Sequence, residues 1–267
     1  MNKRIGLIAG GGTYPLLFAK EAKNLGYEVF VIGFDNITHH NVAAHCNQIK
    51  HFRLGQISAP IKFLKSNHID KVVMAGKVPH VSIFSALSGD LRTAKLLLKL
   101  KDKRPLSILN ALSEELAHDG IKVVSSATFL ENLLPAPGPL TPFEITEQQK
   151  KDMAVGWKAA KTIAGLDIGL AVVVRNCVIV AVEAIEGTDE CIKRAGEIFR
   201  KFSGSPQKND AGMVVVKVAR PNQDERFDLP VVGVKTLEAM SAAGASLLAI
   251  EARKTLILEK DLFIQKA

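Results

Sequence analysis

The first half of the chain alternates short apolar runs with amphipathic stretches. The apolar runs are rich in valine and isoleucine and end in small residues, as buried strands do; they cover 4–9, 28–33, 71–76 and 121–126. The segments between them space their apolar residues as one face of a helix does; they cover 15–25, 57–67, 82–100 and 105–118. This alternation predicts an α/β domain with a Rossmann-like, mostly parallel sheet and helices on its faces.

The stretch 133–144 reads LLPAPGPLTPFE and holds four prolines and one glycine in twelve residues. Neither a helix nor a central strand tolerates proline at that density. The sequence therefore predicts two domains, 1–132 and 145–267, joined by a proline-rich linker over 133–144.

Beyond this linker the pattern predicts a second, mixed α/β domain. Thr146 is a helix-capping residue type, and two β-branched runs meet at Arg175-Asn176, which indicates a hairpin within 169–187. The remaining predicted elements are helices over 146–165, 188–202 and 235–243, and strands over 212–219, 246–252 and 255–259.

Composition narrows the class of protein. A hydrophobic fraction of 47% excludes a disordered chain. The three cysteines form no CxxC pair, which indicates a reducing compartment, and so a cytoplasmic protein, rather than a zinc or disulfide framework. We expect Cys177 and Cys191 to be buried as small hydrophobic residues. No run of about 18 apolar residues predicts a membrane span.

The formal net charge of +8 favours an anionic partner. A phosphate compound, a nucleic acid and an acidic membrane surface all fit this charge, and ordinary solubility explains it equally well. A nucleic-acid-binding face interleaves aromatic residues with basic ones. The aromatic residues of this chain are not arranged in that way. We therefore expect no nucleic-acid partner.

Three consecutive glycines, Gly10 to Gly12, lie where the first strand hands over to the first helix. A turn without Cβ atoms next to a helix N-terminus suits a phosphate group, and Asp35 follows the second strand, where a ribose-binding acid is expected. Pro15, however, occupies the third small position of the dinucleotide fingerprint. A tight turn, a phosphate or nucleotide site and a nicotinamide site all remain open. Lys77, after the strand 71–76, is a further phosphate-binding candidate.

An acidic turn follows the predicted hairpin. Glu183, Glu186, Asp189 and Glu190 lie within eight residues and form a candidate Mg²⁺ site, because Mg²⁺ binds one or two carboxylates together with substrate phosphates. The alternative is a helix start in which Thr188 is the N-cap and the acids occupy the first turn.

A second acidic segment, QDERFDLPVVG over 223–233, places Asp228 two residues before a proline. An aspartate there can orient a water molecule, bind a metal or cap a turn. Lys217 and Arg226 supply nearby positive charge that suits phosphate oxygens.

Several segments together carry a resemblance to a known family. IGLIAGGGTYP, MAGKVP, LDIGLAVVV, VIVAVEAIEGTDE, PNQDERFDLPVVGVKT and GASLLAIEA resemble, in order and spacing, the LpxI family of UDP-2,3-diacylglucosamine pyrophosphatases. The resemblance implies a metal-dependent hydrolase of lipid A synthesis that cleaves UDP-2,3-diacylglucosamine to UMP and 2,3-diacylglucosamine 1-phosphate. The triple glycine would then serve a nucleotide-diphosphate lipid.

The resemblance also assigns roles to residues. It implies that Asp228 is catalytic, as a metal ligand or as the group that orients the attacking water, and that Mg²⁺ or Mn²⁺ is the cofactor. The implied substrate-binding residues are Gly11, Gly12, Lys77, Asp167, Thr188, Lys217 and Gln223. Glu183, Glu186 and Asp189 are the expected further metal ligands.

Two departures from the family pattern concern the substrate. RPLSIL over 104–109 replaces a segment that often reads Gly-Asp-Asp-x-Leu-Leu, and Leu170 replaces a common glutamine.

The leucine-rich, basic stretch 84–101 predicts a helix that lies on an anionic membrane surface or flanks acyl chains, or a core helix with a basic outer face. We expect peripheral contact with the cytoplasmic membrane face and a homodimer. A non-catalytic nucleotide-sugar-binding protein and a nicotinamide-dependent oxidoreductase remain alternatives.

Overall fold

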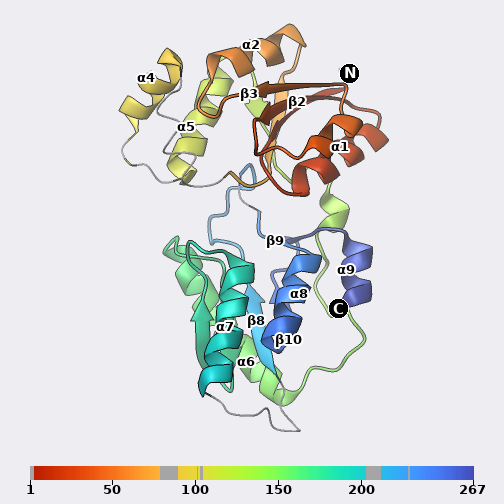
Figure 1. Ribbon diagram of the computed structural model, residues 1–267, viewed down its shortest axis with the longest axis vertical. Coiled ribbons are helices and arrows are strands. Elements are labelled where there is room, and N and C mark those ends of the chain that lie inside the picture. Colours follow the sequence, from red (N-terminus) through yellow and green to blue (C-terminus); the bar gives the residue numbers. More distant parts are fainter. Residues whose placement is uncertain (1–2, 79–89, 101, 103–104, 203–211, 228) are drawn as a thin grey trace. The chain divides into compact units, whose positions relative to one another are not determined.

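The computed structural model describes residues 3–78, 90–100, 102, 105–202, 212–227 and 229–267. The chain divides into two compact units (Figure 1). Unit 1 contains the chain up to Glu131 and the short segment that begins at Asp224. Unit 2 contains Asn132–Gln223 and Leu229–Ala267. No helix in the described part of the chain has the length and apolar character needed to cross a bilayer.

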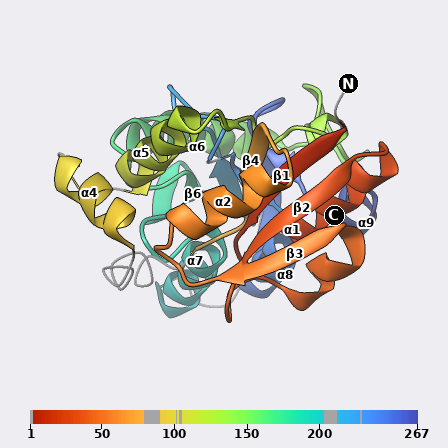
Figure 2. The same cartoon turned by 90° about the horizontal axis from the view of Figure 1, so that it is seen from above.

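Unit 1 is built on a fully parallel five-stranded sheet with the order β3-β2-β1-β4-β5 (Figure 2). The strands are β1 (Arg4–Ala9), β2 (Glu28–Phe34), β3 (Gln48–Phe52), β4 (Lys71–Ala75) and β5 (Lys122–Val123). The Rossmann-like parallel sheet is thus confirmed. The sequence pattern missed β3, an edge strand whose sequence QIKHF is half polar, and β5 is shorter than predicted.

Helices cover both faces of this sheet. They are α1 (Tyr14–Asn24), α2 (Ser58–Ser66), α4 (Leu91–Lys99) and α5 (Pro105–His118), with a 3₁₀ turn η1 (His40–His45). One core cluster joins alternate residues of β2, such as Phe30 and Ile32, to Leu64 of α2, Leu96 of α4 and Leu116 of α5. α1 packs on β1, β2 and β4 with Phe18, Ala19 and Ala22 fully buried. The predicted helix 82–100 is observed as α4, and its earlier part lies outside the described residues.

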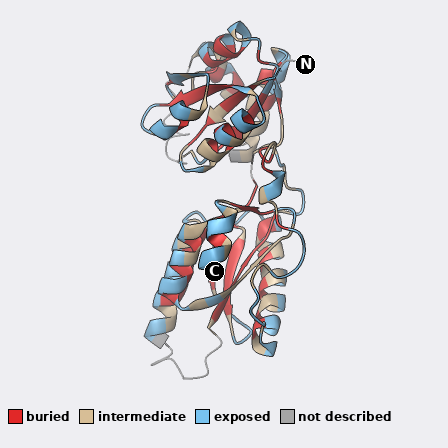
Figure 3. Ribbon diagram, turned by 90° about the vertical axis from the view of Figure 1, so that its right-hand side faces the viewer, coloured by how far each residue is buried: buried red, intermediate tan, exposed pale blue. Residues whose placement is uncertain are grey.

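Unit 2 contains a mixed four-stranded sheet with the order β10-β8-β6-β7, buried between helices (Figure 3). Its strands are β6 (Ala171–Arg175), β7 (Val178–Val182), β8 (Met213–Lys217) and β10 (Ala245–Ile250). α6 (Glu147–Gly165) packs on one face against Val172, Val174, Val214 and Val216. α7 (Thr188–Phe202) and α8 (Val234–Ala243) pack on the other, against Val173 and Val215. The mixed α/β class predicted for this half is confirmed.

Local signals explain where these elements begin and end. Thr146 forms a capping box with Gln149 at the start of α6. The predicted hairpin is present, but its turn is Asn176-Cys177, one residue later than predicted, and both residues have positive φ (48° and 62°). Cys177 is therefore exposed in the turn, contrary to expectation, whereas Cys191 is buried as expected.

A small third layer contains one predicted strand, 255–259, which is observed as β11, whereas β9 and α9 were not predicted. β9 (Val231–Val232) pairs in parallel with β11 (Leu256–Ile257), and α9 (Lys260–Lys266) packs on the pair through Phe263. After a 3₁₀ turn η3 (Glu131–Leu133), residues 134–146 contain no helix or strand.

Candidate functional site

The glycine turn lies at the carboxyl end of β1, between β2 and β4, where the strand order of the sheet reverses. Ligands of open α/β sheets bind at such a switch point. Gly11 and Lys77 form an isolated bridge across it: the amide of Gly11 donates to the carbonyl oxygen of Lys77 (2.8 Å), and the amide of Lys77 donates back to Gly11 (3.0 Å). The bridge ties the loop after β1 to the loop after β4.

The three glycines of the turn differ in backbone contact and conformation. A Cβ on Gly10 would lie 2.8 Å from the carbonyl carbon of Gly76, so Gly10 allows two backbones to meet. Gly12 has φ +91° and open space around its missing side chain. The amides of Gly12 and Thr13 donate no hydrogen bond to any residue that the structure describes. Of the two predicted substrate-binding glycines, Gly12 has its amide free, whereas the amide of Gly11 is engaged.

Lys77 and Asp35 also lie at this edge of the sheet. Lys77 follows β4, and its ammonium group forms no ion pair within the described part of unit 1. Asp35 is exposed directly after β2. The hydroxyl of Thr38 donates to the carbonyl oxygen of Ala9 (2.5 Å) and accepts the amide of Phe34 (2.8 Å), which joins the ends of β1 and β2.

A buried polar chain forms the corresponding centre of unit 2. The ammonium group of Lys217, on β8, donates to the hydroxyl of Thr188 (2.7 Å), which in turn donates to the carboxylate of Glu183 (2.8 Å). All three side chains are more than nine-tenths buried. The second carboxylate oxygen of Glu183 accepts the amide of Leu170 (3.0 Å). These three predicted residues, which come from β8, from the start of α7 and from the position after β7, are therefore brought together.

The helix-start interpretation is confirmed in part, because α7 begins at Thr188 and has Asp189 and Glu190 in its first turn. Thr188 is the first residue of α7, and its hydroxyl joins Lys217 to Glu183 rather than capping the helix. A hydroxyl can accept one hydrogen bond and donate another, so it links a cation to an anion that do not touch. The ammonium group of Lys217 also donates to the carbonyl oxygen of Val231 (3.0 Å). A phosphate group that binds Lys217 or Thr188 would have to replace one of these hydrogen bonds.

The other predicted metal ligands have partners of their own. Glu186 pairs with Arg194 (2.6 Å), whose hydrogen bond lowers the pKa of that carboxyl group. Asp189 accepts the hydroxyl of Thr236 (2.9 Å). Within the described residues, no three histidine, cysteine or acidic side chains converge as a cation site. The acidic turn does not by itself fit a divalent metal.

Asp167 and Gln223 are joined through a third residue, Arg220. The guanidinium group of Arg220 donates to Asp167 (2.8 Å), and the amide of Arg220 donates to the side-chain oxygen of Gln223 (2.9 Å). Asp167 has φ +60°, so its backbone is in the left-handed region, which is uncommon for a residue other than glycine. The substrate-binding role of Asp167 and Gln223 is implied only by the resemblance, and their link through Arg220 was not predicted.

Asp228 lies outside the described residues, and contacts are described only for its neighbours in sequence. Before it, Arg226 donates to the side chains of Asn110 (2.9 Å) and Ser113 (3.0 Å) in α5. After it, the carbonyl oxygen of Val231 accepts the ammonium group of Lys217. The first contact belongs to unit 1 and the second to unit 2.

Ser126 supplies a further contact that the sequence did not reveal. Its amide (2.8 Å) and its hydroxyl (2.9 Å) both donate to the carbonyl oxygen of Glu225. The carbonyl oxygen of Ser126 accepts the hydroxyl of Tyr14 (2.5 Å), and burial raises the pKa of Tyr14 to about 12. Tyr14, next to the glycine turn, is thus linked through Ser126 to the segment that precedes Asp228.

Two protein-family models together match nearly the whole chain. The LpxI N-terminal domain matches residues 4–133, and the LpxI C-terminal domain matches residues 136–267. The chain belongs to the LpxI family. Segment 224–227 thus belongs to the C-terminal family domain in sequence, although it packs in unit 1.

One curated relative within the LpxI family is similar from end to end. It is the UDP-2,3-diacylglucosamine pyrophosphatase LpxI of Caulobacter vibrioides, with 26% identity over 99% of this chain and 94% of the relative. Among solved structures, the ADP complex of N5-carboxyaminoimidazole ribonucleotide synthetase matches 91% of this chain and 45% of its own, at 14% identity. Its TM-score of 0.27 is too low to carry an argument.

Proposed function

We propose that this chain hydrolyses the pyrophosphate bond of UDP-2,3-diacylglucosamine, giving 2,3-diacylglucosamine 1-phosphate (lipid X) and UMP in lipid A biosynthesis. The observation that carries the proposal is the similarity to a UDP-2,3-diacylglucosamine pyrophosphatase over 99% of the chain, with both family domains matched. The ammonium group of Lys77 and the amide of Gly12 have no partner among the described residues of unit 1, which fits an anionic, phosphate-bearing substrate.

In this proposal Asp228 orients the attacking water or binds a metal. The contacts of Arg226 with Asn110 and Ser113 support this role, because they hold the segment that precedes Asp228 on α5 within unit 1. Gly12 and Lys77 bind phosphate oxygens in unit 1. Within unit 2, the proposed substrate-binding residues are Thr188, Lys217, Asp167 and Gln223.

A requirement for Mg²⁺ or Mn²⁺ is part of the proposal. A divalent ion bound to a pyrophosphate neutralises charge that builds up during hydrolysis. Because Glu186 and Asp189 are each occupied by a partner and Glu183 by two, the described carboxylates do not supply a ready site. We therefore assign no step of the reaction to the metal.

The proposal extends to location and assembly. A substrate with two acyl chains resides in a membrane, so we propose that the protein works in the cytoplasm in peripheral contact with the inner face of the cytoplasmic membrane. We also propose a homodimer, which sedimentation equilibrium of the purified chain would test.

The deciding experiment measures UMP release from detergent-dispersed UDP-2,3-diacylglucosamine by the purified full chain, with Mg²⁺, with Mn²⁺ or with EDTA. We expect release that depends on the metal and that disappears in Asp228→Ala. Asp35→Ala is the matched control, because Asp35 is an exposed acid beside the glycine turn to which we assign no role in hydrolysis.

Two other outcomes of these measurements would favour the alternative functions. Substrate binding without turnover by folded wild-type protein would favour a nucleotide-sugar-binding protein. Tight binding of NAD(H), abolished by Asp35→Ala and accompanied by no UMP release, would favour an oxidoreductase.

A further inference from the structure

Helix α4 exposes apolar side chains in a basic setting. Leu91 is 74% exposed and Leu98 is 86% exposed, and they lie seven residues apart, on one face of the helix. Ala94, Lys95 and Lys99 are exposed as well. We call these five residues the outer face of α4. Exposed apolar side chains that share one face and are rimmed by polar residues mark an interaction surface.

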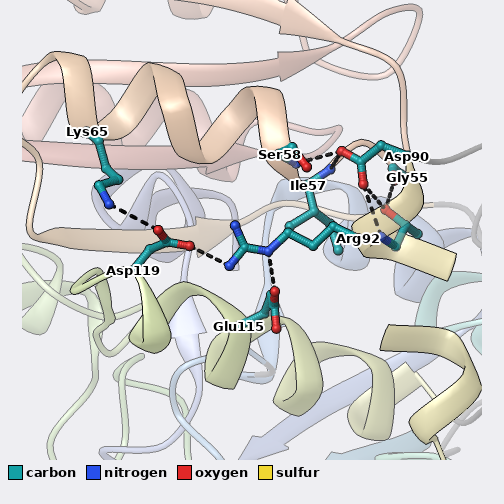
Figure 4. A network of polar contacts seen from close by, with 9 residues as sticks. Gly55, Ile57, Ser58, Lys65, Asp90, Arg92, Glu115 and Asp119 are labelled. Atoms are coloured by element: carbon teal, nitrogen blue, oxygen red, sulfur yellow. Dashed lines mark hydrogen bonds and ion pairs between the residues drawn. The ribbon is translucent and has the colours of Figure 1, made fainter. Parts of the chain in front are cut away.

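The opposite side of α4 is held to unit 1 by a polar network (Figure 4). Asp90 accepts the amides of Ile57 (3.1 Å) and Ser58 (2.7 Å) at the start of α2, and the amide of Thr93 (3.0 Å) in α4. One carboxylate thus caps two helices. Burial alone raises the pKa of Asp90, but these hydrogen bonds outweigh it and lower the pKa to about 2.

Arg92 completes the attachment. Its guanidinium group pairs with Glu115 and, at 2.5 Å, with Asp119 of unit 1, and Asp119 also binds Lys65 of α2 (Figure 4). Leu96 inserts into the core. Because α4 is fixed by this inner side, it cannot turn to bury Leu91 and Leu98 without breaking the network.

The charges of the outer face point to its partner. α4 contains no acidic residue, and Lys95 and Lys99 form no ion pair within the described part of the chain, whereas the one arginine of the helix is paired. Exposed leucines beside unpaired lysines are the pattern of a helix that lies in the interface of an anionic bilayer, with its leucines among the acyl chains and its lysines at the headgroups.

We propose that the outer face of α4 binds the surface of an anionic phospholipid bilayer. The inference deepens the proposed function, and in that respect rests on it, because it names the surface through which the protein meets the membrane that holds its lipid substrate. The polar network of Asp90 and Arg92 keeps the leucines directed outward, so the surface is formed before the bilayer is met.

The test is co-sedimentation of the full chain with vesicles that contain no UDP-lipid. Vesicles of phosphatidylethanolamine and phosphatidylglycerol are compared with vesicles of phosphatidylcholine alone. We expect the variant Leu91→Ser with Leu98→Ser to lower binding to the anionic vesicles roughly tenfold. The matched control is Leu166→Ser with Ile185→Ser, which removes two exposed apolar side chains of unit 2 and leaves binding unchanged.

A second pair of variants tests the charges. Lys95→Gln with Lys99→Gln lowers binding to anionic vesicles roughly tenfold, and 0.5 M salt does the same to the wild type. Equal binding by all variants, or wild-type binding to neutral vesicles as strong as to anionic ones, would overturn the inference. Circular dichroism and the melting temperature of the leucine variant check that it is folded, and the lysine variant tests the same face with both leucines in place.

This result and that of the hydrolysis assay are independent. Vesicle binding needs no turnover, so it tests the membrane-binding inference even if no UMP is released. Conversely, the leucine variant retains turnover of detergent-dispersed substrate if the proposed function is correct, and loses it only for substrate embedded in anionic vesicles.

Discussion

Gly169 and Glu183 are in such close contact that a Cβ atom on Gly169 would lie 2.1 Å from the carbonyl oxygen of Glu183. The contact brings the loop before β6 onto the end of β7. The next residue, Leu170, donates its amide to the Glu183 carboxylate (3.0 Å), so the same approach orients the buried polar chain of Glu183, Thr188 and Lys217.

Gly169→Ala is therefore expected to destabilise the protein by about 3 kcal/mol or more, because a carbonyl oxygen of the main chain cannot move aside as a flexible side chain can. Gly165→Ala is the matched control: its Cβ would lie 3.8 Å from Pro221, and alanine in the last turn of α6 is expected to add up to about 1 kcal/mol of stability. Urea denaturation measures both. Equal unfolding midpoints for the two variants would contradict the contact.

Much of the framework of both units could be predicted from the sequence. β1, β2 and β4 are buried parallel strands, so their apolar runs are continuous, and α6 carries its start signal in Thr146 and Gln149. β3 was missed because an edge strand with polar residues has no such run. The hairpin turn was misplaced by one residue, because Asn176 and Cys177 adopt positive φ without a glycine to mark it.

The site could be predicted only in part, for a different reason. Glu183 and Thr188 are close in sequence and were grouped correctly, but their link to Lys217 on β8 depends on strand order. The docking of Arg226 onto α5 spans more than a hundred residues, and no local pattern records it. Residue type alone also cannot show that Glu186 is occupied by Arg194.

The buried chain of Glu183, Thr188 and Lys217 makes a prediction that separates stability from activity. Lys217→Met leaves the Glu183 carboxylate buried without its cation, at an expected cost of about 3 kcal/mol or more. The double variant Glu183→Gln with Lys217→Met removes both charges and is expected to recover about 2 kcal/mol. Denaturation of the two single variants and the double variant measures this coupling.

Activity of the same double variant tests the proposed role of Lys217 at the substrate. If Lys217 binds phosphate oxygens, the double variant is stable but its UMP release stays at least about tenfold below wild type. Recovery of turnover together with stability would show instead that Lys217 acts only in the fold.

The anchor at Arg226 makes a prediction about positioning. Arg226→Ala removes the hydrogen bonds to Asn110 and Ser113 that hold the segment before Asp228. We expect kcat for UMP release to fall about tenfold with KM nearly unchanged, because the reacting groups are less well placed while the substrate contacts remain. Arg226→Lys, which keeps the charge but not the paired geometry, is expected to restore kcat only in part.

Arg200→Ala is the control for this variant, since Arg200 binds the carbonyl oxygen of Ala242 within unit 2. A fall in kcat of the same size in Arg200→Ala, or a rise in KM alone in Arg226→Ala, would rule out a positioning role for Arg226.

The shared cap at Asp90 predicts how stability depends on pH. Its folded-state pKa is lowered to about 2, below the unfolded value of about 3.9. A depressed carboxyl pKa contributes stability that is fully present above the unfolded value and is lost as the pH falls through the folded value. Because Asp90 caps two helices, Asp90→Ala is expected to cost about 2 kcal/mol at pH 6, and this difference from wild type should shrink between pH 4 and pH 2.

Urea denaturation of wild type and Asp90→Ala at several pH values between 6 and 2 measures that convergence. Asp261→Ala, which removes an exposed acid with no hydrogen bond to the described residues, provides the background for general acid effects. The loss of unfolding free energy in Asp90→Ala could instead be the same at pH 2 as at pH 6. Asp90 would then stabilise α2 and α4 without its charge, and the charge of the carboxylate would not be what orients the outer face of α4.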